Sequence, residues 1–87
     1  MMNKMNKLEN LFASEEFKAE FSANLKRLRK AAGLTQPQLG TAMGFSDKSA
    51  MRMIQKWERM EQLPYIDKLR PLCKALGCTL EDLIPEE

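Results

Sequence analysis

The spacing of apolar residues predicts a chain of helices. From Ser14 to Gly33, apolar residues recur every three or four positions, and Ser14, Glu15 and Glu16 form a typical helix start. We therefore expect a long amphipathic helix that ends at Gly33. Its apolar face carries Phe17, Phe21, Leu25 and Leu28.

A shorter helix is predicted from Gln36 to Met43. Thr35 followed by Gln38 matches a capping box, in which two side chains and two backbone amides bond reciprocally at the start of a helix. Gly44 can take the left-handed conformation that ends a helix. The helix and the break after it are thus both encoded locally.

A third helix follows this break. We expect Phe45 to Ser49 to form an extended loop, in which Ser46, Asp47 or Ser49 is the N-cap. Beyond the loop, apolar residues at helical spacing form a seam that faces the core. The seam consists of Ala50, Met53, Ile54 and Trp57, so the Trp57 ring is expected in the core.

The opposite face of the third helix carries long polar side chains. At about 100° per residue, this outer face contains Lys48, Arg52, Gln55 and Arg59, with Lys56 and Met51 at its margins. A stripe of hydrogen-bond donors opposite an apolar seam suits a helix that lies in the major groove of DNA.

Two further helices are expected near the C-terminus. The fourth begins near Pro64 and ends at Gly77, and Pro71 requires either a late start with Asp67 as the cap or a bend. Residues 79–84 read as a cap and a short fifth helix. The residues expected to face inward from the fourth helix are Ile66, Leu69, Leu72, Cys73 and Leu76.

Together these elements predict an all-α fold, a compact bundle of four to five helices that contains a helix-turn-helix. Eighty-seven residues are enough for one such core. We expect residues 14–87 to form the helix-turn-helix domain and residues 1–13 to form an N-terminal arm. The arm carries apolar residues on one helical face, and it is either an amphipathic segment or a poorly ordered tail.

Several short blocks of the sequence follow one another in a characteristic order. They are Leu25-Lys26-Arg27-Leu28-Arg29, Gly33-Leu34-Thr35-Gln36, Leu39-Gly40, Gly44-Phe45, Ile54-Gln55-Lys56-Trp57-Glu58-Arg59, Pro64, Ala75-Leu76-Gly77 and Leu80-Glu81-Asp82-Leu83. In these blocks the chain resembles the Xre/Cro-type phage repressor family of helix-turn-helix proteins. The resemblance covers roughly residues 25 to 84 and implies a lambda-repressor-like DNA-binding domain.

The sequence departs from the family pattern at two places. The stretch from Gly44 to Ile54 is longer than the usual turn by about one helical turn. The family also prefers Gly after the Glu-Arg pair, whereas this chain has Met60. We therefore expect either a differently built turn there or a recognition helix that runs on by a few residues.

The net charge of +2 conceals a basic body and an acidic tail. Fourteen basic and eight acidic residues precede Thr79, and the last nine residues contain four acids. Such asymmetry is typical of a nucleic-acid binder, although a mixed solvated surface would look similar. The block Lys26, Arg27, Arg29 and Lys30 suits either a helix C-terminus or phosphate contacts.

The composition offers no chemistry for catalysis. The chain has no histidine, no Gly-rich phosphate loop and two cysteines, Cys73 and Cys78, so we expect no metal site, no cofactor and no enzyme activity. The cysteines are interpreted as small buried hydrophobes in a reducing cytoplasm. No signal peptide or membrane-spanning stretch is predicted.

We expect the site residues to divide into two groups. Arg52 and Gln55 are the best base readers, because Arg pairs with guanine and Gln with adenine, and Met51 could touch a thymine methyl. Glu58 is expected to be structural. The phosphate contacts are expected from Lys48, Ser49, Lys56 and Arg59, and the resemblance adds Gln36, which in that family contacts the DNA backbone and braces the recognition helix.

The predicted function is sequence-specific binding of double-stranded DNA by a small prokaryotic or phage transcriptional regulator, in a repressor-like role. A homodimer is expected at least on DNA, joined through residues 1–12 or 80–84. One alternative is an antitoxin or restriction-modification controller that also binds a protein partner. Another is a protein-interaction module on the same fold.

Overall fold

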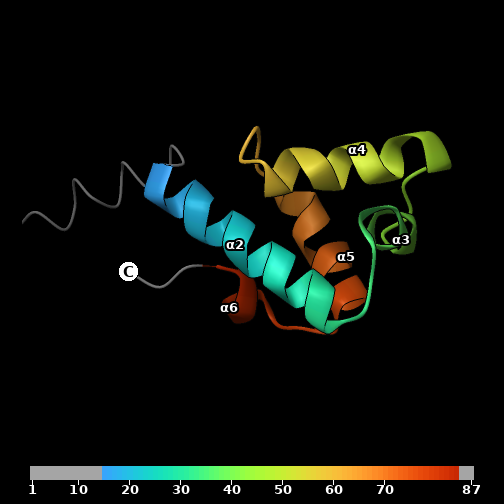
Figure 1. Ribbon diagram of the computed structural model, residues 1–87. Coiled ribbons are helices and arrows are strands. Elements are labelled where there is room, and N and C mark those ends of the chain that lie inside the picture. Colours follow the sequence, from blue (N-terminus) through green and yellow to red (C-terminus); the bar gives the residue numbers. More distant parts are fainter. Residues whose placement is uncertain (1–14, 85–87) are drawn as a thin grey trace, which may run out of the picture.

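The computed structural model describes residues 15–84, which contain five helices and no strand (Figure 1). The predicted all-α helix-turn-helix fold is therefore confirmed. The arm predicted for residues 1–13 lies outside this range. The helices are α2 (Glu15–Ala31), α3 (Gln36–Ala42), α4 (Asp47–Glu58), α5 (Ile66–Leu76) and α6 (Leu80–Leu83).

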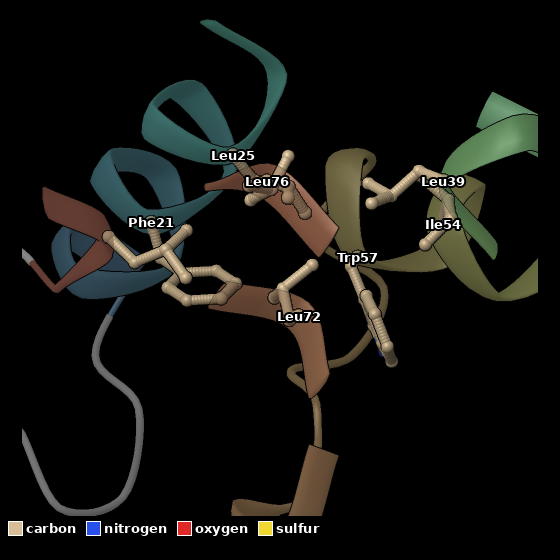
Figure 2. Packing of buried hydrophobic residues seen from close by; sticks show 8 residues of the cluster. Phe21, Leu25, Leu39, Ile54, Trp57, Leu72 and Leu76 are labelled. Carbon is tan, nitrogen blue, oxygen red and sulfur yellow. The ribbon is translucent and has the colours of Figure 1, made fainter. Parts of the chain in front are cut away.

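All five helices contribute to one hydrophobic core. Figure 2 shows apolar side chains from α2, α3, α4 and α5 converging on each other, with Trp57 of α4 beside Leu72 of α5. Burying side chains of this size contributes roughly 1.5–3 kcal/mol each. The buried cluster comprises Phe21, Leu25, Leu39, Ile54, Trp57, Leu72, Leu76 and Leu83.

Helix α3 forms as predicted. The Thr35 hydroxyl accepts from the Gln38 amide, and the Gln38 side chain accepts from the Thr35 amide, so both bonds of the capping box are present. At the other end Gly44 has φ +101°, and the amide of Phe45 donates to the carbonyl of Gly40 at 3.1 Å. This is a Schellman C-terminus, which turns the chain sharply toward α4.

The expectation of an extended loop over Phe45 to Ser49 is wrong. Helix α4 already begins at Asp47, with Ser46 as its N-cap, one of the three predicted candidates. The amide of Ala50 donates to the Ser46 carbonyl at 2.9 Å, so the first helical bond forms where the loop was expected. The extra residues relative to the family pattern therefore lengthen the helix rather than the turn.

A close approach fixes the angle between α3 and α4. A Cβ atom added to Gly40 would collide with the backbone of Ala50, which is itself buried. The two helices can therefore touch backbone to backbone only because residue 40 has no side chain. Sequence patterning predicted the two helices but not this contact.

Helix α5 begins at Ile66, with Tyr65 as its N-cap, and continues through Pro71. A late start capped by Asp67 is therefore wrong. Pro71 deletes the bond to the Asp67 carbonyl, but Asp67 is exposed, so water can satisfy that oxygen. The expectation that Ile66 faces inward is also wrong, because 84% of its surface is exposed.

The C-terminal part follows the prediction more closely. Thr79 and Asp82 form a second capping box at the start of α6, and the Thr79 amide that donates to the Asp82 carboxylate lowers the pKa of that carboxyl group. Leu83 is fully buried. Cys73 and Cys78 are free and half-buried, and burial next to Cys73 raises the pKa of Cys78 to about 11, so its thiol stays protonated at neutral pH.

Candidate nucleic-acid interface

Helix α4 has two sharply different faces. Ala50, Ile54 and Trp57 on the inner face are at most 1% exposed. The outer face contains the side chains predicted as the recognition surface. Of these, Lys48, Met51, Arg52 and Arg59 are exposed, and Ser49, Gln55 and Lys56 are half-buried.

The polar groups of this outer face have few partners within the protein. Among residues 15–84, the side chains of Lys48, Arg52, Gln55 and Lys56 make no hydrogen bond or ion pair. Arg59 lies 4.0 Å from Glu61 in an exposed pair, which constrains it little. These donors are therefore available to a ligand.

A buried ion pair anchors the C-terminal end of α4. Arg29 of α2 donates to both carboxylate oxygens of Glu58, at 2.6 and 3.2 Å, and also to the carbonyl of Leu34 at 2.9 Å. Both side chains of the pair are at most 10% exposed. Such a bidentate pair fixes geometry as well as charge. It confirms that Glu58 is structural.

Gln36 joins the same cluster from the first turn of α3. Its side-chain amide donates to Glu58 at 3.0 Å. One carboxylate therefore links α2, α3 and α4, so the two helices of the helix-turn-helix are held at a fixed relative orientation. This bond supports the bracing role that the family resemblance implied for Gln36.

Trp57 is in the core, as predicted. Its ring is fully buried and meets Phe45 edge to face, with centroids 6.0 Å apart. The Ser22 hydroxyl of α2 donates to the backbone carbonyl of Trp57 at 2.7 Å. The indole Nε1 has no hydrogen-bond partner among the described residues, so the ring is held by packing.

The two ends of α4 are capped in different ways. At the N-terminus, the Ser46 side chain accepts no capping bond from a backbone amide, and its hydroxyl lies 3.1 Å from that of Ser49. At the C-terminus, Met60 adopts φ +66° and the Glu61 amide donates to the Lys56 carbonyl at 2.9 Å. The helix therefore ends at Glu58 in a Schellman turn and does not run on.

Sequence reasoning missed the role of Arg29. It placed this residue in a basic block with Lys26, Arg27 and Lys30, whereas only those three are exposed. Arg29 follows Leu25 by four positions and so continues the apolar face of α2. That position on the buried face was the available signal for a structural arginine.

The fold and the outer face of α4 together define a helix-turn-helix DNA-binding domain. A helix-turn-helix family model, HTH_3, matches residues 25–83, so the chain belongs to the Xre-type, lambda-repressor-like family. This is a family of DNA-binding regulatory domains rather than of enzymes. No curated protein and no solved structure matches the chain. None of the helices in residues 15–84 has the length and apolar character needed to cross a membrane.

Proposed function

We propose that this protein binds a specific sequence in double-stranded DNA as a small prokaryotic or phage transcriptional regulator, in a repressor-like role. The observation that carries the proposal is the contrast on α4. One face is buried against the core, while the other presents long donors that lack partners in the described part of the protein. A helix of this kind fits the major groove of B-DNA.

In this proposal the middle of α4 reads the bases. Arg52 and Gln55 lie one turn apart, and each offers two groups for a base edge, Arg toward guanine and Gln toward adenine. Met51, which is 44% exposed, would contact a thymine methyl group. These three side chains would supply most of the sequence preference.

Phosphate contacts would come from the ends of α4 and from α3. Lys48 and Ser49 lie in the first turn of α4, where backbone amides also favour an anion. Lys56 and Arg59 add positive charge near its other end. Gln36 uses one amide hydrogen on Glu58 and keeps the second amide hydrogen to donate to a phosphate oxygen of the DNA backbone.

A single α4 contacts few base pairs, so we propose that two copies act together on a two-fold site. Their recognition helices would lie about 34 Å apart, one turn of the DNA. The dimer would form at least on DNA. Selection of bound sequences from a random duplex library tests this proposal, because it reveals both the preferred sequence and its symmetry.

Two other functions make different predictions in a simple binding assay. A protein-interaction module on this fold would show no steep salt dependence on duplex DNA, whereas neutralisation of several phosphates gives a strong loss of affinity with salt. An antitoxin or restriction-modification controller would select a DNA site and also retain a protein partner. Recovery of no preferred duplex, together with salt-insensitive binding, contradicts the proposed function.

A further inference from the structure

We propose that Tyr65 and Ile66, at the start of α5, form the surface through which two copies of this chain meet on DNA. This inference rests on the proposed function and names the part of the molecule that completes it. Tyr65 is 76% exposed and Ile66 is 84% exposed, the highest values among the large hydrophobic residues of the described range.

The fold does not need these two side chains. Tyr65 is the N-cap of α5, yet its side chain makes no capping bond, and Ile66 occupies the first helical position. Adjacent Leu63 and Pro64 are half-buried, so the exposed pair extends an apolar surface that begins in the core. Adjacent exposed apolar side chains that extend such a surface offer area that a partner can bury.

The charges around the patch favour a second copy over a nucleic acid. Four charged residues lie near it in the sequence, two basic and two acidic, which are Lys68, Arg70, Glu61 and Asp67. Arg59 is left for the phosphate contact proposed above. A polyanion would be repelled by the acids as much as it is attracted by the bases. In a two-fold interface each residue meets a different residue of the other copy, so a balanced set can pair acids with bases.

The position of the patch is compatible with simultaneous DNA binding. It follows the C-terminal end of α4, where the connection to α5 turns back toward the core (Figure 1). The proposed base readers Met51, Arg52 and Gln55 all lie within α4, before the turn at Met60 that separates this helix from the patch. A second copy docked on Tyr65 and Ile66 would therefore leave the base-reading part of α4 open.

The size of the patch explains why the dimer should depend on DNA. Two exposed side chains on each of two copies bury on the order of several hundred Å², below the roughly 1,200 Å² of a stable interface. Such a contact is weak between free molecules. When both copies are bound to one duplex, the effective concentration of each copy near the other is high. The same weak contact then forms and adds to the affinity for DNA.

The structure also disfavours one of the surfaces that the sequence suggested for the dimer. In residues 80–84, Leu83 is fully buried and Ile84 packs against the core, so only Leu80, 46% exposed, remains available. Leu80 is the first residue of α6, just as Ile66 is the first residue of α5. It is therefore a matched control position.

The test uses a duplex with two inverted half-sites and a duplex with one half-site, both taken from the selected sequences. Tyr65→Gln combined with Ile66→Gln removes apolar surface without adding charge, and Leu80→Gln does the same on α6. All variants should melt like the parent, because the changed side chains are exposed. Native mass spectrometry and gel-shift titration then measure stoichiometry and affinity.

We expect the Tyr65/Ile66 variant to bind the single half-site with unchanged affinity and the inverted repeat at least about tenfold more weakly, without cooperativity. The Leu80→Gln protein should bind both duplexes like the parent. Cooperative two-chain binding by the Tyr65/Ile66 variant overturns the inference, since a different surface, such as the one predicted for residues 1–12, would then join the copies.

An experiment can show separately whether the DNA-binding proposal is wrong and whether the Tyr65/Ile66 contact between copies is wrong. If the parent protein binds no duplex at all, the DNA-binding proposal fails, and sedimentation of the free protein at millimolar concentration tests the surface alone. Weaker self-association of the Tyr65/Ile66 variant would then support the surface. Equal self-association of parent and variant would exclude it.

Discussion

The two faces of α4 are built from the same twelve residues but obey different constraints. The inner face is held by neighbours on every side, because Ile54 and Trp57 are fully buried and Glu58 is bonded to two other helices. On the outer face, Lys48 and Arg52 are exposed and make no bond within residues 15–84. The inner face determines where the helix lies, and the outer face is left to determine what it binds.

Changes on the two faces should therefore have separable effects. A substitution on the inner face should lower the free energy of unfolding, and any loss of DNA binding should follow from that. A substitution on the outer face should alter binding alone.

The largest effect is expected from Trp57→Ala. Removing a fully buried ring should lower the free energy of unfolding by about 3–5 kcal/mol, measured by urea denaturation. DNA binding should be lost only to the extent that the protein unfolds. A variant that melts like the parent but fails to bind would show that the ring belongs to the outer face.

Glu58→Ala should come next. It leaves Arg29 buried without its anionic partner and removes the bond from Gln36, so we expect a loss of about 3 kcal/mol in unfolding free energy. Glu61→Ala is the matched control, because its pair with Arg59 is exposed, and it should cost less than about 1 kcal/mol. Equal losses in the two variants would contradict the anchoring role of Glu58.

Gly40→Ala tests the contact that sets the helix-turn-helix angle. The added methyl group would overlap the backbone of Ala50, so α3 and α4 must separate, at a cost of about 1–3 kcal/mol. Thr41→Ala, at the neighbouring exposed position of α3, should change stability far less. Thermal melting of the two variants checks the prediction, and a Gly40→Ala protein as stable as the parent would refute it.

The smallest effect is expected at Met60. This residue holds φ +66°, which disfavours any side chain, so Met60→Gly should raise the unfolding free energy by about 0.5–1 kcal/mol. Gly44→Ala makes the opposite change at the end of α3, where a Cβ atom would meet nothing within 4 Å. It should lose about 1 kcal/mol through backbone strain alone. Changes of the same sign in both variants would argue against this account.

Much of the fold was predictable because its signals are local. The capping boxes at Thr35 and Thr79 involve residues three positions apart, and both form as the sequence predicts. Comparison with family spacing was less reliable than these local signals, since it suggested a loop where Ser46 and Asp47 start α4. Periodicity also placed Ile66 inward, but at the first position of α5 its side chain lies outside the bundle.

The parts of the site that could not be predicted depend on distant residues. Arg29 and Glu58 are 29 positions apart, and no local pattern reveals that they pair. The contact between Gly40 and Ala50 likewise appears only when two helices are packed together. The outer face of α4 was predictable as a surface, because the apolar seam determines which residues lie opposite. Their contacts with bases remain predictions.

The affinity of outer-face variants for the selected DNA site tests the central claim most directly. Arg52→Ala and Gln55→Ala should each lose about 1–3 kcal/mol of specific binding, roughly 5- to 150-fold, with unchanged melting. Arg27→Ala is the control, since this exposed arginine donates to Asn24 at 3.4 Å and acts on the charge of Asp82, at the start of α6, so we expect no phosphate contact from it. Without a contact to DNA, it should bind within about twofold of the parent. Parental affinity in both α4 variants would contradict the account.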